Sequence, residues 1–190
     1  MSQLTTSLEE AHLVPGAAAA LIPASFAPSA DLSVSFGDAP VQLGNLLRVS
    51  QVQQKPTISF QIEADAGAAA SDSSYLVMLV DPDAPTPEDP KFAFWRHWVV
   101  SGLQPGRGCG AAATALTEFL GPGPKPESNP HRYLFLLFRE PAGLALGKSD
   151  VGGEAFIERR SFDAATFVAR HGLQLVGLNW VLCAADEWCA

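Results

Sequence analysis

The chain has 190 residues, of which 47% are hydrophobic and 17% are charged, a balance typical of a folded domain. Its 20 acidic and 12 basic residues give a formal net charge of −8. Phosphate backbones and anionic membranes repel such a protein, so the charge argues against a nucleic-acid partner and against broad adsorption to membranes. A local site for a single phosphate is still compatible with this charge, because a few side chains can oppose it.

The sequence contains no apolar run long enough to span a bilayer. The alanine-rich stretch at 16–22 is similar to the core of a secretory signal, but Glu9 and Glu10 precede it and the first basic residue is Arg48. Because a secretory leader begins with positive charge, we expect a cytoplasmic protein without a signal peptide.

The chain has three cysteines, Cys109, Cys183 and Cys189. A small and odd number of cysteines favours a reducing compartment over a disulfide framework. A single bridge between Cys183 and Cys189 in an exported protein is left as an alternative.

In chain order, the first expected element is a short helix over 7–13, with Ser7 as its N-cap and Pro15 after its end. Residues 1–30 thus form an N-terminal helix followed by a wrapping segment. The stretches 32–36 and 58–62 alternate apolar and polar residues, which predicts half-buried antiparallel strands.

The runs at 75–80, 94–100 and 133–138 are largely apolar, as in central strands buried on both faces. A helix is predicted after Ser161 and ends at Gly172, and 173–182 follows as the last strand. The pattern indicates a mainly β single domain spanning 1–190, with a few peripheral helices.

The segment 81–85 reads Asp-Pro-Asp-Ala-Pro and directly follows the strand at 75–80. Pro82 and Pro85 make this loop stiff. If Asp81 and Asp83 stay extended, their carboxylates point to the same side. Alone, the segment is equally typical of a rigid turn with solvated acids.

Two histidines lie on or beside predicted strands. Strict alternation places His97 on the same face as Trp95, Val99 and Ser101, opposite Arg96, Trp98 and Val100. His131 begins the run that includes Tyr133. Histidines donate hydrogen bonds and can become cationic, so these side chains suit a phosphate or a carboxylate.

Other chemistries have weaker signals. Asp81 and His97 leave open a small hydrolase with an acid–histidine dyad, although no serine stands out as its nucleophile. The histidines and cysteines match no zinc spacing, so no metal is expected. The glycine-rich stretches at 143–149 and 106–111 depart from the phosphate-loop and dinucleotide patterns and predict flexible loops.

Taken in order, several of these motifs resemble the phosphatidylethanolamine-binding protein family. They are Asp-Pro-Asp-Ala-Pro at 81–85, Trp95 and His97, Gly-Pro-Gly-Pro at 121–124, and Pro-His-Arg-Tyr-Leu-Phe-Leu-Leu-Phe at 130–138. Phe92 stands where many members carry Tyr. The flanking stretches 28–36, 39–45 and 173–180 are similar to fungal members that inhibit a vacuolar serine carboxypeptidase.

The resemblance implies a central antiparallel sheet, a second smaller sheet and peripheral helices, with no catalytic activity and no cofactor. It implies a pocket for phosphate-like or phospholipid head groups, in which His97 and His131 donate hydrogen bonds. The pocket residues that we expect are Asp81, Asp83, Pro85, Trp95, His97, Gly121, Gly123, Pro124, His131 and Tyr133.

The resemblance also implies the partners of the chain. In the carboxypeptidase-inhibiting members the N-terminal segment enters the protease cleft, so Ser2, Gln3, Leu4 and Leu8 are the expected partner contacts. We therefore expect a monomeric, non-enzymatic inhibitor of a serine carboxypeptidase, cytoplasmic with an association to the vacuole. A phospholipid-binding regulator of kinases or small GTPases is the alternative within the family.

Overall fold

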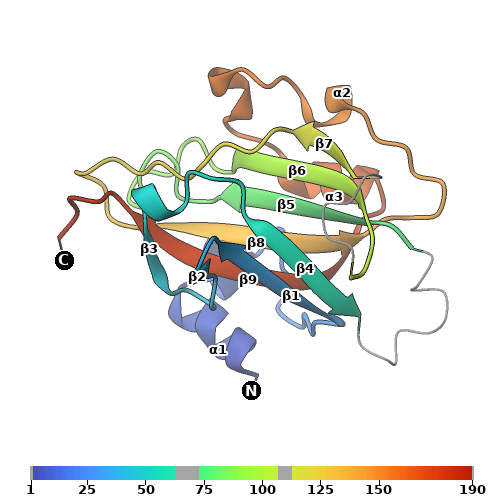
Figure 1. The fold of residues 1–190 in the computed structure, drawn as a ribbon, viewed down its shortest axis with the longest axis horizontal. Coiled ribbons are helices and arrows are strands. Elements are labelled where there is room, and N and C mark those ends of the chain that lie inside the picture. Colours follow the sequence, from blue (N-terminus) through green and yellow to red (C-terminus); the bar gives the residue numbers. More distant parts are fainter. Residues whose placement is uncertain (1, 63–72, 107–112, 190) are drawn as a thin grey trace.

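The computed structural model describes residues 2–62, 73–106 and 113–189 (Figure 1). A sheet of six strands and a sheet of three strands pack against each other, and short helices lie at the periphery. The predicted fold class, mainly β with a large central sheet and a second smaller one, is confirmed. Cys109 and most of the glycine-rich stretch at 106–111 lie outside the described residues.

The larger sheet is antiparallel except at one edge, where β3 and β9 run parallel. Its strands in spatial order are β3 (Leu46–Arg48), β9 (Gln174–Ala184), β8 (His131–Arg139), β5 (Tyr75–Asp81), β6 (Trp95–Leu103) and β7 (Thr114–Thr117). The smaller antiparallel sheet has the order β2 (Ala39–Pro40), β1 (Ala30–Phe36), β4 (Thr57–Ile62).

The central strands are buried on both faces, as their continuous apolar sequences predict. All seven residues of β5 are buried. Val77 and Leu79 pack in the core between the two sheets, whereas Leu76 and Met78 pack in a second core on the opposite face. Alternation along one strand therefore supplies both cores of the protein.

A β-bulge in β6 changes the faces that we expected around His97. Leu79 pairs with Trp98 and Val80 pairs with Arg96, so His97 is the extra residue between two paired positions. Strict alternation fails there, so Arg96, which pairs with Val80 of the second core, lies on the face of Val99 instead of the predicted face of Trp98 and Val100. Trp98 and Val100 pack in the core between the sheets, and Val99 packs in the other core.

The N-terminal helix begins earlier than predicted. Helix α1 spans Gln3–Glu10, and Ser2 is its N-cap, since the Ser2 hydroxyl accepts a hydrogen bond from the backbone N–H of Thr5 at 3.2 Å. Ser7, the expected cap, lies inside the helix, where its hydroxyl donates to the carbonyl of Leu4. Leu8 faces inward and packs in the second core.

The C-terminal helix α3 (Ala164–Arg170) is capped by Asp163 rather than by Ser161. The Asp163 carboxylate accepts from the N–H of Thr166 at 3.0 Å. The helix ends before Gly172, as predicted, and this glycine has a positive φ of 62°.

The described residues contain four further short helical segments: η1 (Leu13–Ala17), η2 (Val49–Gln51), α2 (Lys148–Val151) and the 3₁₀ turn η5 (Phe156–Arg159). Helix α2 lies where the sequence predicted a loop. The segment that carries α2 and η5 covers the edge of the larger sheet beside β6 and β7 (Figure 1).

Cys183 is buried and Cys189 is exposed, and both are free thiols, so the bridge considered from the sequence does not form. Burial is the main reason that the pKa of Cys183 is raised to about 12. Among the described residues, no helix is long and apolar enough to cross a membrane.

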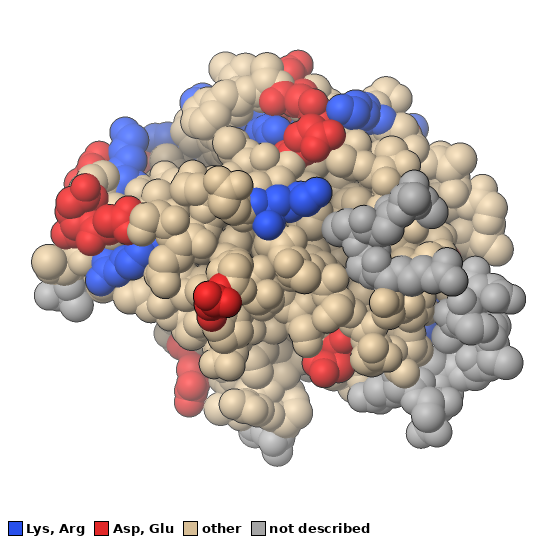
Figure 2. All heavy atoms as spheres, in the orientation of Figure 1, with Lys and Arg blue, Asp and Glu red and all other residues tan. Residues whose placement is uncertain are grey.

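Charged side chains on the face drawn in Figure 2 form small separate groups of both signs, with uncharged surface between them. On that face the described residues make no broad basic patch. The distribution agrees with the argument from net charge against a nucleic-acid partner.

Candidate functional site

A cavity of about 430 Å³ lies where the start of β8, the end of β5 and the start of β6 meet the loop at 120–125. Eight of the residues expected from the sequence line it: Asp81, Pro85, Trp95, His97, Gly121, Gly123, His131 and Tyr133. One strand end and two strand starts thus bring together side chains that are far apart in the chain. Asp83 and Pro124, which we also expected, are not among its lining residues.

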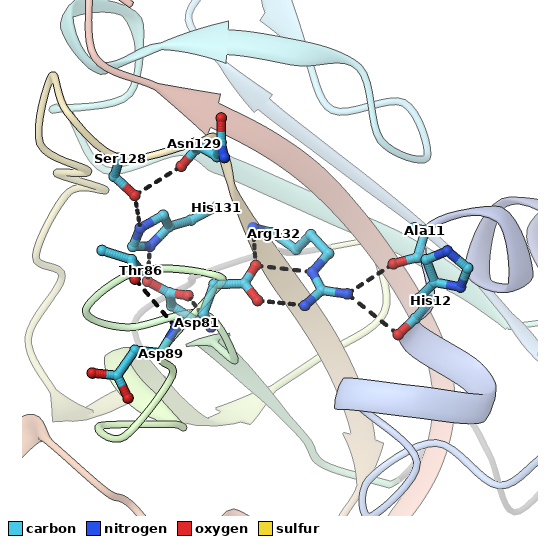
Figure 3. Close-up of polar contacts among 10 residues, drawn as sticks. Ala11, His12, Asp81, Thr86, Asp89, Ser128, Asn129, His131 and Arg132 are labelled. Atoms are coloured by element: carbon cyan, nitrogen blue, oxygen red, sulfur yellow. Dashed lines mark hydrogen bonds and ion pairs between the residues drawn. The ribbon is translucent and has the colours of Figure 1, made fainter.

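His131 is held by partners at both ring nitrogens (Figure 3). Its Nδ1 lies 2.8 Å from a carboxylate oxygen of Asp81, and its Nε2 lies 3.0 Å from the hydroxyl of Ser128. All three side chains are almost fully buried. Both ring nitrogens of His131 are thus engaged within the protein in this conformation, and donation from His131 to a ligand stays a prediction.

Asp81, His131 and Ser128 are connected by hydrogen bonds in the same order as the acid, histidine and serine of a hydrolytic triad. However, Ser128 has no access to the cavity. Ser128 is 2% exposed, and it is not among the lining residues. Its hydroxyl also donates to the carbonyl of Asn129 at 2.9 Å. A nucleophile must reach the substrate, so the geometry favours a structural role in fixing the His131 ring.

Asp83 faces away from the cavity and binds Arg132. One carboxylate oxygen accepts from the backbone N–H and from Nε of Arg132 at 2.7 and 2.9 Å, and the other accepts from Nη2. Because residues 82 and 83 form a turn, strand alternation does not apply, and the two acids point in different directions. Asp81 remains at the cavity, where it also accepts from the N–H of Asp83.

His97 has one free ring nitrogen. Its Nδ1 lies 2.7 Å from the carbonyl oxygen of Leu120, and since a carbonyl can only accept, Nδ1 carries the proton. The unprotonated Nε2 of the neutral ring is then left for the cavity. Burial, the largest influence, lowers the pKa of His97, and the charges of Arg159 and His131 lower it further, while Asp81 and the Leu120 carbonyl oppose them.

Tyr133 contributes a hydroxyl that stays protonated. Burial and then the charge of Asp81 raise the pKa of Tyr133 well above its ordinary value. The ring lies edge-on to His97, with centroids 5.2 Å apart. The phenol can therefore act as a hydrogen-bond donor at any physiological pH.

Two hydrogen-bond donors at the cavity have no partner within the protein. Among the described residues, four buried side-chain polar atoms lack a hydrogen bond, and two of them, Trp95 Nε1 and Arg160 Nε, belong to cavity-lining residues. The guanidinium of Arg160 stacks on Phe92 at 4.5 Å and on Trp95 at 5.7 Å. Buried donors are normally satisfied, so this pair points to an acceptor that enters from outside.

Arg160, Lys125, Phe156, Phe92 and Gln53 line the cavity but were not predicted as site residues. Phe92 was noted only for its place in the family pattern. The others come from segments without strand or helix periodicity, so their sequences carried no signal of a site. Arg160 follows a second arginine in an otherwise acidic stretch, and that charge contrast is the clue that could have identified it.

The two expected glycines have different roles. A Cβ on Gly121 would lie 3.0 Å from the backbone carbonyl of Val52 and from the side chain of Gln53, so the absence of a side chain lets the loop pack closely. A Cβ on Gly123 would meet no atom within 4 Å. Gln53 also ties the loop down by donating to the carbonyl of Pro122 at 2.8 Å.

Two buried arginines hold the wall of the cavity that contains Phe156. Arg159 donates to the carbonyl groups of His97 at 3.1 Å and Glu118 at 2.9 Å, and Arg96 donates to the carbonyl of Gly153. Burial, followed by the charge of Arg159, lowers the pKa of Arg96 to about 10. Among the described residues, no group of His, Cys, Asp and Glu side chains is placed to hold a metal ion.

Comparison with known proteins supports the resemblance found in the sequence. A family model described as phosphatidylethanolamine-binding protein matches residues 25–175. The carboxypeptidase Y inhibitor of Saccharomyces cerevisiae is 31% identical over 150 residues, which cover 65% of this chain and 68% of that protein.

Solved structures agree. The crystal structure of carboxypeptidase Y inhibitor complexed with the cognate proteinase matches with a TM-score of 0.80 at 25% identity, over 96% of this chain and 95% of that chain. The phosphatidylethanolamine-binding protein from Plasmodium vivax matches with a TM-score of 0.76 at 23% identity, over 96% of this chain and 97% of that chain, and shares the fold. The chain belongs to the phosphatidylethanolamine-binding protein family.

Proposed function

We propose that this chain is a binding protein whose cavity holds a phosphate-type anion, such as a phosphodiester. The observation that carries the proposal is the pair of unpartnered donors, Trp95 Nε1 and Arg160 Nε, at residues that line one cavity. An anion supplies the acceptors that these donors lack, and charge-assisted hydrogen bonds to it are stronger than neutral ones.

The cavity residues divide into groups that bind and groups that position. Trp95, Arg160 and the Tyr133 hydroxyl are the donors, and Lys125 adds a cation to the lining of the cavity. Asp81 and His131 form a hydrogen-bonded pair that fixes the wall between them. In this assignment Asp81 orients His131, while the donor role passes from His131 to neighbouring residues.

The substitution Trp95→Phe tests the proposal, because it removes the indole N–H and keeps an aromatic ring. Losing one donor to a charged ligand costs about 1.5–3 kcal/mol, so we expect the affinity for glycerophosphoethanolamine to fall about 10- to 150-fold. Isothermal titration calorimetry of the folded proteins measures this. Trp98→Phe is the matched control on the same strand, since Trp98 does not line the cavity.

Trp98→Phe is expected to lose stability but to keep the affinity of the unmodified chain. Equal affinity in Trp95→Phe and the unmodified chain would show that the indole N–H does not hold the ligand. Absence of binding by the unmodified chain to glycerophosphoethanolamine and to inorganic phosphate would overturn the function itself.

We propose as a second function that the chain inhibits a serine carboxypeptidase of the carboxypeptidase Y type. The support is the similarity to the yeast inhibitor in both sequence and structure. Ser2 and Gln3 are exposed at the start of α1, and Gln3 and Leu4 line a separate depression of about 730 Å³ beside β1 and β9. Leu8 is 5% exposed and packs in the second core, so the partner contacts proposed here are limited to Ser2, Gln3 and Leu4.

Deletion of residues 2–4 tests the second function and leaves the buried Leu8, Leu13 and Val14 in place. Truncating the central contacts of an interface typically costs about 2 kcal/mol or more, so we expect the inhibition constant against carboxypeptidase Y to rise at least about 30-fold. The double variant Glu9→Gln, Glu10→Gln changes exposed residues at the other end of the same helix and serves as control.

The control variant should inhibit like the unmodified chain, and both variants should bind glycerophosphoethanolamine normally. Full inhibition by the truncated protein would exclude the N-terminus as the reactive segment. Circular dichroism verifies that the truncated protein is folded, so that lost inhibition is not mistaken for unfolding.

A further inference from the structure

A long groove runs beside the N-terminal helix α1. One hollow of about 730 Å³ lies beside the first turn of the helix, and a second of about 610 Å³ lies beside its last turn. Leu43 lines both hollows, and in each of them α1 and the loop at 41–44 form the walls and β9 forms the floor. The two hollows therefore make one groove, called here the α1 groove. Among the described residues, none that lines the α1 groove also lines the anion cavity.

The floor of the α1 groove is apolar. Leu178, Trp180 and Leu182 come from alternate positions of β9, so they share one face of that strand. Leu4 and Ala11 add half-buried apolar side chains on the side of α1. The helix has eight residues and rises about 1.5 Å per residue, so the groove is about 12 Å long, which is about two turns of a second helix.

Leu43, at the middle of the groove, has a backbone conformation that is unusual for its side chain. Its φ is 44°, and the φ of Gly44 is 100°. The N–H of Asn45 donates to the carbonyl of Gln42 at 3.2 Å and closes a turn around these two residues. Asn or Gly is usual at the first central position of such a turn, and a large side chain there costs free energy. The N–H of Leu43 donates to Oδ1 of Asn179 at 3.1 Å, so the strained residue is held as a fixed apolar anchor.

The unpaired charges along the groove are negative. Glu10 and Asp31 line it and are exposed, and neither makes an ion pair within the described part of the chain. Arg132 also lines it, but its guanidinium is already bound to Asp83. The other ionisable residue of the lining is the exposed His12. An acidic rim above an apolar floor complements a partner with a basic and an apolar face, and the net charge of −8 attracts such a partner.

We propose that the α1 groove binds a basic amphipathic helix of a partner protein. The apolar face of that helix lies on β9 and against Leu43, and its Lys or Arg side chains reach Glu10 and Asp31. This is recognition of a helix in a groove, in which a few apolar anchors fill the groove and charged side chains flank it. The inference goes beyond both functions proposed above, and it uses no residue of the anion cavity.

Titration with a model helix tests the proposal. The probe is a fluorescently labelled peptide of leucine and lysine with the amphipathic period of a helix, and the matched peptide carries glutamate in place of lysine. Fluorescence anisotropy should show that the unmodified chain binds the lysine peptide and not the glutamate peptide. Binding of neither peptide, or of the glutamate peptide alone, would overturn the proposal.

The substitution Leu43→Gly tests the apolar anchor. Glycine adopts a positive φ freely, so the variant should fold, which circular dichroism verifies. Its affinity for the lysine peptide should fall about tenfold, because one large apolar side chain no longer contacts the peptide. Ile157→Gly is the matched control, since Ile157 is 65% exposed and lies outside the groove, and it should bind like the unmodified chain. Equal affinities of the two variants would show that Leu43 is not an anchor and that the groove is not the site.

The double variant Glu10→Gln, Asp31→Asn tests the acidic rim. At low salt its affinity for the lysine peptide should fall about fivefold, and the difference should disappear at high salt, because exposed ion pairs are weak and screened. Asp38→Asn, Glu187→Gln removes the same charge from exposed positions outside the groove and should have little effect. If the control weakens binding as much, the net charge alone attracts the peptide and the proposal is wrong.

Other occupants of the groove give different results with Leu43→Gly. The variant should bind glycerophosphoethanolamine and inhibit carboxypeptidase Y like the unmodified chain. A raised inhibition constant with unchanged peptide affinity would assign the groove to the protease. A dimer of the unmodified chain in sedimentation equilibrium that dissociates in the variant would assign the groove to a second copy. Either result would overturn the proposal, whereas loss of the anion function alone would leave peptide binding as expected.

Discussion

Neighbouring residues at the start of β8 act on opposite sides of the sheet. His131 lines the cavity and is held by Asp81 and Ser128, whereas Arg132 points to the N-terminal helix (Figure 3). The side chain of Arg132 is held by Asp83. The alternation of a strand is the cause of this division. The dipeptide His131-Arg132 therefore links the hydrogen-bonded group at the cavity to the one beneath the N-terminal helix, although both residues belong to one motif in the sequence.

Because of His97, the affinity of the cavity for an anion should depend on pH. The hydrogen bond that the His97 ring makes determines the direction of this dependence. In the neutral ring Nδ1 donates to Leu120, so Nε2 can donate to an anion only after the ring is protonated. Because burial lowers the pKa of His97, the empty cavity holds the neutral ring near pH 7. Anion binding then takes up a proton, and affinity should rise as the pH falls.

The expected rise is at most about tenfold per pH unit for one linked proton, between about pH 8 and 5. Calorimetry with glycerophosphoethanolamine measures it, because the charge of a phosphodiester is constant over this range. His97→Gln removes the titrating group, and its affinity should vary less with pH. An affinity of the unmodified chain that is constant or falls on acidification would exclude His97 as the linked donor.

At the scale of elements, α1 is attached to the sheet through its C-terminal end. Nη1 of Arg132 donates to the carbonyl groups of Ala11 and His12 at 2.7 and 3.3 Å, just beyond the helix (Figure 3). A cation at this position adds a donor to carbonyl groups just beyond the C-terminal end of α1 and interacts favourably with the helix dipole. The same guanidinium binds Asp83, whose side chain is 1% exposed.

The substitution Arg132→Met should destabilise the protein strongly, because it leaves the Asp83 carboxylate buried without its cation. Removing one partner of a buried ion pair costs about 3–5 kcal/mol, and we expect the free energy of unfolding in urea to fall by about this amount. The double variant Asp83→Asn, Arg132→Met should be more stable than Arg132→Met, since no buried charge is left unpaired. Equal stability of these two variants would contradict the assignment.

At the scale of the whole molecule, local sequence predicted the sheets and most of the cavity wall. The apolar runs of β5 and β8 are long enough to specify central strands. Because these strands are antiparallel, the polar residues at the end of β5 and at the start of β8 lie at the same end of the sheet. The cavity residues that belong to strand ends could therefore be identified from sequence.

The remaining cavity residues depend on tertiary contacts. Arg160 reaches the cavity because Arg96 and Arg159 bind backbone carbonyl groups of distant segments, and no periodicity encodes such contacts. The bulge at His97 and the turn at Asp83 each changed the direction of a side chain that strict alternation had placed elsewhere. Such local departures from regular geometry are set by packing that sequence patterns do not record.

The contrast between Gly121 and Gly123 has a practical consequence for remodelling the site. Position 121 is closed to any side chain by the backbone of Val52, whereas the direction of a side chain at 123 is open. A library that diversifies position 123 can therefore reshape the entrance while the loop keeps its packing. A cysteine placed there would also give a specific attachment point for a fluorophore that reports occupancy of the cavity.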